Sequence, residues 1–197
     1  MSGRLPQLRP ADLDDAQRRL YDSLVAGEVP WADKSKIQVI EPDGTLLGPF
    51  NPLLFSPVLG AAHVGVFRAD KSSTSLPARI HELIVLTVGA AWGCDYELYA
   101  HSAVAKAAGL PDAVIQALVS GQLPVFQSEQ EAIAHEFTRQ LIHRHQIEPK
   151  TYAEAEQAFG HKGLVDMVLL VGLYLTTCAI INAFNIPSPS PISAPRS

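Results

Sequence analysis

One stretch of the sequence brings together a thiol, a carboxylate and an imidazole at helical spacing. The segment from about residue 94 to residue 109 is predicted to be a helix that ends at Gly109. On it, Cys94, Glu97 and His101 follow one another at positions i, i+3 and i+7. Side chains at these intervals project from one stripe of a helix. A histidine that titrates near neutral pH beside a carboxylate is suited to general acid–base catalysis.

A second polar pair precedes this helix. Arg79 and Glu82 stand three residues apart on a predicted helix that begins near Pro77, and Gly89 and Gly93 mark a tight corner between the two helices. The residues around both pairs are strongly apolar, and buried ionisable groups need partners. An isolated histidine is usually structural, but a cluster of this kind favours function. We therefore expect a small polar pocket inside an apolar bundle.

The spacing of these residues resembles that of a known family. The patterns are R-x-x-E at 79–82, C-x-x-E-x-x-x-H at 94–101 and A-x-x-x-G-L at 105–110. Together they are similar to the carboxymuconolactone decarboxylase family, which also contains the alkylhydroperoxidase-D-like (AhpD-like) proteins. The resemblance runs from about residue 13 to residue 184 and is sharpest between residues 48 and 110. It implies an all-α, AhpD-like helical bundle.

The motif combines features of two branches of that family. In the peroxidase branch, a Glu is followed by C-x-x-C and then by a His one helical turn later. Cys94, His101 and Glu82 match that pattern, but Glu97 stands where the second cysteine is expected. The Y-E-x-x-x-H arrangement around Glu97 instead resembles the decarboxylase branch, with Leu98 in place of the usual Trp.

The resemblance to the decarboxylase branch implies cofactor-free acid–base chemistry. The expected reaction is a decarboxylation, or a related lyase or isomerase step, on a small organic acid or lactone. His101 is the expected acid and base, Glu97 is its expected orienting partner, and Glu82 joins them. Arg79 and Tyr96 are expected to bind substrate, Arg79 through a bidentate contact to a carboxylate unless Glu82 neutralises it. This chemistry requires neither a metal nor an organic cofactor.

Two alternatives stay open. In the first, the protein is a thiol peroxidase of the peroxiredoxin type, with Cys94 as the reactive thiol and Glu82 and His101 as its proton relay; a helix N-terminus favours the thiolate. Its disulfide partner would then be an external thiol or Cys178, which is otherwise interpreted as a packing residue. In the second, the protein is a non-catalytic member whose pocket binds a metabolite.

Composition limits the class of protein. The chain has 197 residues, 47% of them hydrophobic, which predicts a single domain with a sizeable core. Its net charge of −5 and scattered basic residues argue against nucleic acid as a partner. Two distant cysteines and the lack of an apolar leader predict a reducing, cytoplasmic location. The family resemblance implies a homo-oligomer, a dimer, trimer or hexamer.

Hydrophobic periodicity predicts helices along most of the chain. They cover about residues 11–26, 51–69 with a kink at Ser56–Pro57, 111–119, 128–143, 152–159 and 163–184. The stretch 37–48 is expected to be a short hairpin or an irregular loop, and the Pro-rich tail 185–197 to be extended or disordered. The apolar run 167–181 is shorter than the ~20 residues of a membrane span, so we expect a core helix or a subunit interface and no membrane partner.

Overall fold

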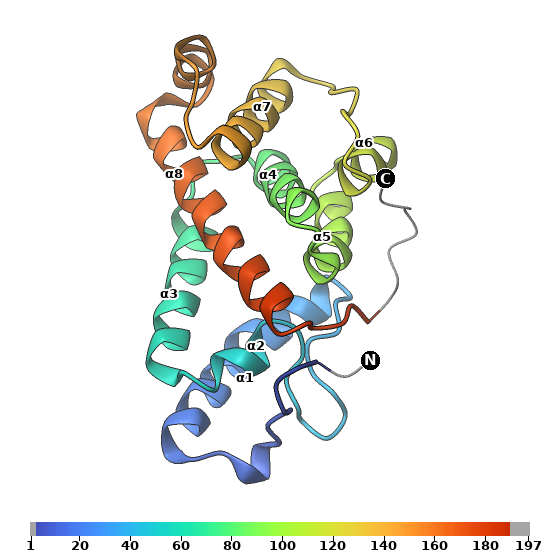
Figure 1. Ribbon diagram of the computed structural model, residues 1–197, viewed down its shortest axis with the longest axis vertical. Coiled ribbons are helices and arrows are strands. Elements are labelled where there is room, and N and C mark those ends of the chain that lie inside the picture. Colours follow the sequence, from blue (N-terminus) through green and yellow to red (C-terminus); the bar gives the residue numbers. More distant parts are fainter. Residues whose placement is uncertain (1–2, 190–197) are drawn as a thin grey trace.

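The computed structural model describes residues 3–189, and the regular elements of this part of the chain are all helices, without a β-strand (Figure 1). In chain order the elements are η1 (Pro10–Asp12), α1 (Asp15–Lys34), α2 (Phe50–Leu53), α3 (Pro57–Ser73), α4 (Ala78–Ala91), α5 (Asp95–Ala107), α6 (Asp112–Val119), α7 (Glu129–Arg144) and α8 (Pro149–Ala183). The all-α prediction is confirmed, including the break between α2 and α3 at Ser56.

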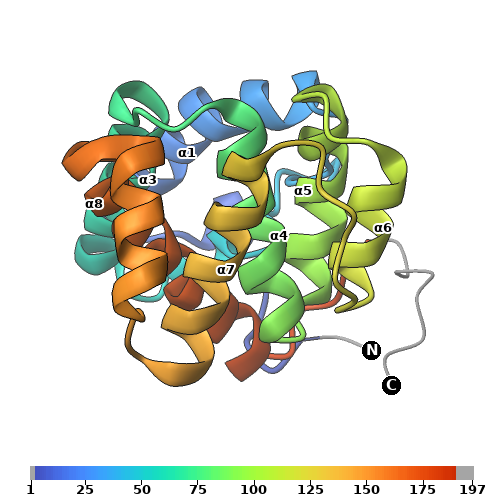
Figure 2. The same ribbon diagram turned by 90° about the horizontal axis from the view of Figure 1, so that it is seen from above.

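Helix α4 lies at the centre of the bundle. It packs against α5, α6, α7 and α8, as the view from above shows (Figure 2). Nine of its 14 residues are buried, among them one carboxylate, Glu82. A helix that is apolar on nearly every side belongs in a core. The fold therefore carries Glu82 into the interior, where only a polar partner can stabilise it.

A tight corner joins α4 to α5. Gly93 has a positive φ of 60°, and the N–H of Cys94 returns to the carbonyl of Gly89 at 2.8 Å. A Cβ at Gly89 would lie 3.1 Å from the side chain of Leu98, so the two helices approach closely at this glycine. The corner sets the N-terminus of α5 against α4 and brings Glu82 of α4 to His101 of α5.

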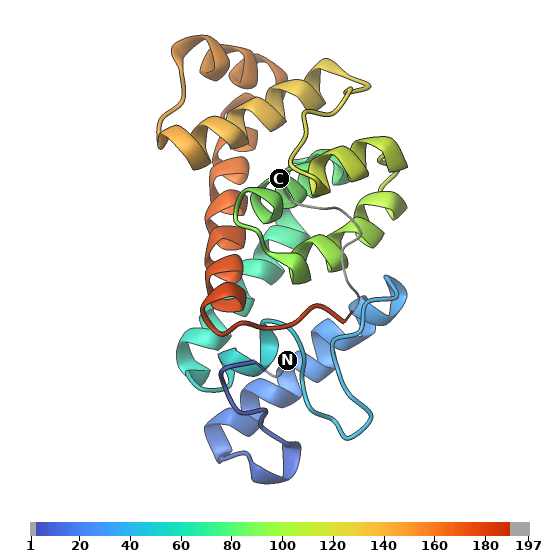
Figure 3. The ribbon, with the colours of Figure 1, turned by 45° about the vertical axis from the view of Figure 1, so that its right-hand side comes forward.

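Helix α8 is two helical segments joined at Gly160, whose φ of 65° and ψ of 175° are not helical. The predicted separation at this glycine is confirmed, although the first segment begins earlier than predicted. The second segment runs obliquely between α3 and the α4–α5 pair in Figure 1, and Figure 3 shows the same orange-to-red helix upright along the bundle. By length and composition alone α8 could cross a membrane, but half of its most apolar window is buried inside the protein. A core helix of a soluble protein passes the same test of length and composition.

The first helix departs from the prediction. It was expected to stop at Gly27, but α1 continues through Gly27 and Pro30 to Lys34. A Cβ at Gly27 would lie 2.7 Å from the Arg68 guanidinium, which lies over the helix there and donates to Glu28 at 2.9 Å. Gly27 therefore makes room for a cross-helix ion pair, and tertiary packing overrides its weak helix propensity.

The segment between α1 and α2 forms a small irregular loop with one β-bridge, Ile40 to Leu46, as expected for 37–48.

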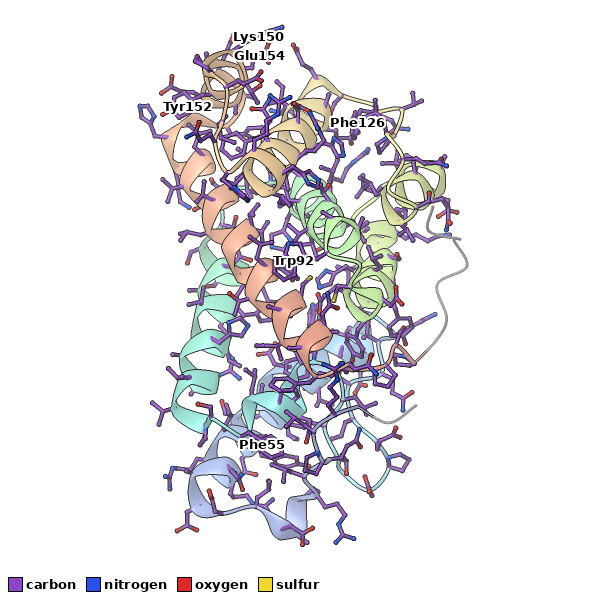
Figure 4. All side chains as sticks on the ribbon, viewed as in Figure 1. Phe55, Trp92, Phe126, Lys150, Tyr152 and Glu154 are labelled. Atoms are coloured by element: carbon purple, nitrogen blue, oxygen red, sulfur yellow. The ribbon has the colours of Figure 1, made fainter. Side chains whose placement is uncertain are left out.

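Figure 4 shows Phe55, which follows α2, and Tyr152, near the start of α8, at opposite ends of the molecule. Most of the predicted tail, residues 190–197, lies outside the described residues.

Candidate active site

Glu82 and His101 form the centre of the site. Glu82 Oε2 lies 2.7 Å from His101 Nδ1, and both side chains are at least 93% buried. Helix α4 supplies the carboxylate and α5 the imidazole, and the tight corner between the helices brings them together. An ionised carboxylate only accepts hydrogen bonds, so Nδ1 of His101 carries the proton of this bond. The second ring nitrogen, Nε2, is then free to exchange protons.

Two other groups face Nε2 of His101. The hydroxyl of Tyr174 on α8 lies 3.1 Å away, and Glu97 Oε2, one helical turn before His101, lies 3.4 Å away. The structure thus corrects the prediction that Glu97 is the orienting partner of His101. Glu82 orients the ring through the shorter bond, and Glu97 faces the reactive nitrogen.

Burial and charge shift the pKa values of Glu82 and Glu97 in opposite directions. Burial acts to raise the pKa of Glu82, but the charge and hydrogen bond of His101, with those of His81, lower it to about 2. Burial acts to lower the pKa of His101, but the charge and hydrogen bond of Glu82, helped by Glu97, raise it overall. Burial raises the pKa of Glu97 by more than His101 lowers it. Two carboxylates with opposite shifts beside one imidazole are a typical acid–base arrangement.

The hydrogen bonding continues from Glu82 towards the protein surface. His81 Nδ1 lies 3.0 Å from Glu82 Oε1, and His81 Nε2 lies 2.8 Å from Asp70 Oδ2 on α3. Both ring nitrogens face carboxylate oxygens, which suits an imidazolium. Burial acts to lower the pKa of His81, but the hydrogen bonds to Asp70 and Glu82 raise it to about 9.

A small cavity opens beside this cluster. Its free volume is about 50 Å³. Its lining combines the polar groups Glu97, His101, Tyr174, His63 and Thr177 with an apolar wall of Trp31, Ile37, Val39, Pro49, Phe50, Leu53, Val64, Phe67, Tyr96 and Ala100. Drug-sized ligands occupy pockets of roughly 300–1,000 Å³, so this one suits a very small ligand or one that moves a wall residue.

A larger hollow, of about 310 Å³, lies beside the N-terminal segment and the loop 38–48. Of the predicted site residues only Tyr96 borders it, and no member of the Glu82–His101 cluster does. The smaller cavity is therefore the candidate active site, because it holds the acid–base groups.

The structure does not bring Arg79 to this cavity. Its guanidinium donates to Glu131 on α7 at 2.5 Å and to Gln127 at 3.0 Å, so it neither pairs with Glu82 nor lines the pocket. Tyr96 does line the cavity, but its hydroxyl donates to the Gln38 carbonyl at 3.0 Å. The ring of Tyr96 therefore borders the cavity, while its hydroxyl anchors the loop that contains Gln38.

The two cysteines lie together in the core. Cys94 precedes α5 and Cys178 lies on α8, and both are 0% exposed. A hydrogen bond with Cys94 is the main cause that raises the pKa of Cys178, and burial adds to it. Asn182, one turn beyond Cys178, donates to the Trp92 carbonyl at 2.7 Å and ties the same two segments. Among the described residues, no group of three or more His, Cys, Asp or Glu is arranged to hold a metal ion.

Sequence reasoning missed several members of the site. His63 lines the cavity, and its Nε2 lies 3.2 Å from the Thr177 hydroxyl. Tyr174 lies in an apolar run and was not predicted to belong to the site. A hydroxyl among such residues usually has a buried hydrogen-bond partner, here His101. His81 directly precedes Glu82 and passed unremarked because neighbouring residues on a helix usually face different ways.

Comparisons with known proteins agree with this architecture. Residues 57–140 match the sequence model of the carboxymuconolactone decarboxylase family. None of the curated proteins matches the sequence significantly. Among solved structures, an uncharacterized peroxidase-related protein with an AhpD core from Ralstonia eutropha JMP134 has a TM-score of 0.73 at 17% identity, over 96% of this chain and 94% of the other.

Two further structures share the fold. A protein of unknown function from Agrobacterium tumefaciens, described as a putative antioxidant defence protein AhpD, has a TM-score of 0.64 at 20% identity, over 72% of this chain and 97% of the other. The debrominase Bmp8 has a TM-score of 0.69 at 14% identity, over 93% of this chain and 91% of the other. Residues 57–140 thus match the model of the carboxymuconolactone decarboxylase family, and the described part of the chain shares its helical fold with AhpD-like structures.

Proposed function

We propose that the protein is a cofactor-free acid–base enzyme that decarboxylates or isomerises a small conjugated organic acid or lactone. The observation that carries this proposal is the 2.7 Å hydrogen bond from His101 Nδ1 to Glu82, with Nε2 beside Tyr174 and Glu97, which both line the cavity. A buried carboxylate on one nitrogen fixes the tautomer and stabilises the imidazolium that forms when the other nitrogen takes a proton.

The proposed reaction follows from these positions. A substrate whose carbonyl is conjugated to the bond that breaks accepts the electron pair left by departing carbon dioxide. His101 then delivers its Nε2 proton to the carbon that gained electron density, and Glu82 holds the ring throughout. Tyr174 and Glu97, both beside Nε2, are placed to hydrogen-bond the substrate oxygen or to return a proton.

The cavity favours a small and partly apolar substrate. Its wall contains Trp31, Phe50 and Phe67, which can stack on a flat conjugated molecule. A cysteine-to-alanine variant of the debrominase Bmp8, which shares this fold, has been solved with 2,3,4-tribromopyrrole, a small flat ring. The aromatic wall and this related ligand support a small, flat substrate. The proton transfer itself depends on His101.

Lys71 contacts a wall residue of the cavity but, like Arg79, is not among the residues that line it. Its ammonium lies 3.9 Å from the ring centroid of Trp31, which lines the cavity. Burial lowers the pKa of Lys71 despite the opposing effect of Glu28, as expected for a cation held partly away from water. Its ammonium also lies 3.9 Å from Glu28 Oε2, so a substrate carboxylate at Lys71 would compete with that contact.

The test is a screen of conjugated acids and lactones in heavy water. Each compound is followed by loss of ultraviolet absorbance and by mass spectrometry, because a proton delivered to carbon appears in the product as deuterium. We expect one deuterium per turnover in the wild type and a fall in kcat of at least about 100-fold in His101→Gln. His161→Gln, at a histidine 82% exposed and paired with Glu156, is the matched control. Turnover that His101→Gln leaves unchanged would refute the proposal.

The contact between Cys94 and Cys178 favours thiol peroxidase activity as a second candidate function. In that reaction the Cys94 thiolate attacks a peroxide oxygen and releases an alcohol or water. The Cys178 thiol then displaces water from the Cys94 sulfenic acid, so two thiols and one peroxide give a disulfide, an alcohol and water. Cys178 would thus replace the missing second cysteine of C-x-x-C. The full burial of both thiols places this candidate second.

We also propose that the protein acts as a homo-oligomer in the cytoplasm. Apolar side chains remain exposed on the adjacent helices α3 and α8, namely Val58, Leu59, Val66, Val165, Val168 and Leu169. Exposed apolar side chains gathered on two adjacent helices support a protein interface there. Sedimentation equilibrium at micromolar concentration is expected to give a multiple of the 21.3 kDa chain mass, and a pure monomer would exclude the oligomer.

A further inference from the structure

One wall separates the cavity beside His101 from the larger hollow near the N-terminal segment. The inner cavity has a free volume of about 50 Å³ and the outer hollow one of about 310 Å³. Among the described residues, Tyr96 alone lines both spaces. The next residue, Glu97, lines only the inner cavity, where it faces Nε2 of His101. The two spaces therefore meet at the side chain of Tyr96.

The loop between α1 and α2 forms another part of this wall. Ile37 and Val39 line the inner cavity, whereas Gln38, between them, lines the outer hollow. The same change of side recurs where the loop enters α2, because Gly48 lines the outer hollow and Phe50 the inner cavity. Neighbouring residues of one short segment thus face different spaces, so a single stretch of chain divides them here.

Tyr96 is held firmly in this wall. Its hydroxyl donates to the Gln38 carbonyl at 3.0 Å, and burial raises the pKa of Tyr96, so the hydroxyl keeps the proton of this bond. Gly48 packs against the other side of the phenol, because a Cβ at this glycine would lie 2.4 Å from Cζ of Tyr96. A ring that is bonded at its hydroxyl and packed against backbone is not the wall residue that moves for a ligand.

The geometry points to a residue that determines specificity: we infer that the ring of Tyr96 limits the size of the substrate by closing the inner cavity towards the outer hollow. The site then takes a conjugated acid with one small ring, and a second ring directed towards the outer hollow meets Tyr96. A steric barrier of this kind selects by rejecting the larger molecule. The inference rests on the proposed function, because it takes the cavity beside His101 as the substrate site.

Three substitutions at Tyr96 separate the ring from its hydrogen bond. Tyr96→Leu removes the atoms that pack on Gly48, which are Cζ, Cε1 and the hydroxyl, and keeps an apolar side chain in the core. Tyr96→Met, with a flexible and unbranched side chain, carries the same test if Tyr96→Leu does not fold. Tyr96→Phe removes only the hydroxyl and its bond to Gln38, so the ring still closes the cavity.

The test measures binding and needs no turnover. The probes are benzoate, with one ring, and 2-naphthoate, with two fused rings. In protein labelled with ¹³C-histidine, the ring signals of His101 and His63 report occupation of the inner cavity, which both residues line, and His101→Gln and His63→Gln assign the signals. We expect the wild type and Tyr96→Phe to prefer benzoate. Tyr96→Leu is expected to bind 2-naphthoate about tenfold or more tightly than the wild type does. Tyr152→Ala, at a tyrosine 45% exposed and outside both spaces, is the matched control and should change nothing.

Three results would overturn the size limit. In the first, 2-naphthoate shifts the His101 signal of the wild type as strongly as benzoate does. In the second, Tyr96→Leu and Tyr96→Met still exclude 2-naphthoate or bind it without a shift of the His101 signal, which would place it in the outer hollow alone. In the third, Tyr96→Phe admits 2-naphthoate as well as Tyr96→Leu does, which would assign the limit to the hydrogen bond and not to the ring. The proposed function fails separately, because turnover that His101→Gln leaves unchanged refutes the acid–base role without altering which acids enter the cavity.

Discussion

Glu82 and His101 are 19 positions apart in the sequence, yet a 2.7 Å bond joins the carboxylate of α4 to the imidazole of α5 inside the core. The bond exists because a tight corner folds the two helices against each other. Its energetic consequence is that two buried charges stabilise each other where neither would be stable alone. Its chemical consequence is a fixed histidine tautomer with one nitrogen available for proton transfer.

Replacing Glu82 by Gln is expected to lower both the pKa of His101 and the catalytic rate. The charge and hydrogen bond of Glu82 raise the pKa of His101, so their removal leaves the effect of burial, which lowers it. Carbon-13 NMR of the histidine ring measures this pKa directly, and kcat should fall by about 100-fold. A pKa of His101 that stays unchanged in Glu82→Gln would contradict the electrostatic argument.

The stability of the protein is expected to decline at mildly alkaline pH because His81 loses its proton there. The folded-state pKa of His81 is about 9, above its ordinary value of 6.5, so its protonation contributes stability fully below 6.5 and loses that contribution as the pH rises through 9. The loss should be on the order of 1–3 kcal/mol. Urea denaturation across this range measures it, and His81→Gln should flatten the dependence.

Replacing Arg79 by Ala is expected to reduce stability while the kcat of the folded enzyme is retained. The guanidinium is 36% exposed, but its partner Glu131 is 3% exposed and would be left as an unpaired buried charge. The expected cost is about 1–3 kcal/mol, less than for a fully buried pair because solvent screens Arg79. Arg139→Ala, which removes a more exposed pair with Glu136, is the matched control and should cost less. If Arg79→Ala instead raised KM without a loss of stability, Arg79 would be a substrate-binding residue.

Replacing Cys94 by Ser is expected to leave most of the activity of the folded protein. Its thiol is not needed for proton transfer by His101, and the main cost is a buried hydroxyl, worth about 1–3 kcal/mol of stability. Cys178→Ser should behave in the same way, because the two residues share one environment. Peroxide treatment followed by mass spectrometry checks the alternative. Rapid formation of a Cys94–Cys178 disulfide, with loss of activity in both variants, would favour the thiol peroxidase.

The sequence was sufficient for features that depend on neighbours along one helix. Glu97 and His101 share a stripe because four residues make about one helical turn, and this spacing holds in any tertiary context. The glycine at 160 marked a helix boundary in the same local way. The prediction failed at Gly27, because the reason for that glycine is Arg68, 41 positions further along the chain.

Tertiary structure decided which groups meet His101. Periodicity placed Glu97 closest, but the crossing of α4 and α5 brings Glu82 nearer to Nδ1, and the path of α8 brings Tyr174 to Nε2. The same packing turned Arg79 towards Glu131. By itself, the sequence determined the all-helical fold, the corner and the residue types of the site, because these follow from local propensity and spacing. Only the packing of distant helices decided the partner of each nitrogen, because hydrogen bonds depend on differences of less than 1 Å that no spacing along the chain encodes.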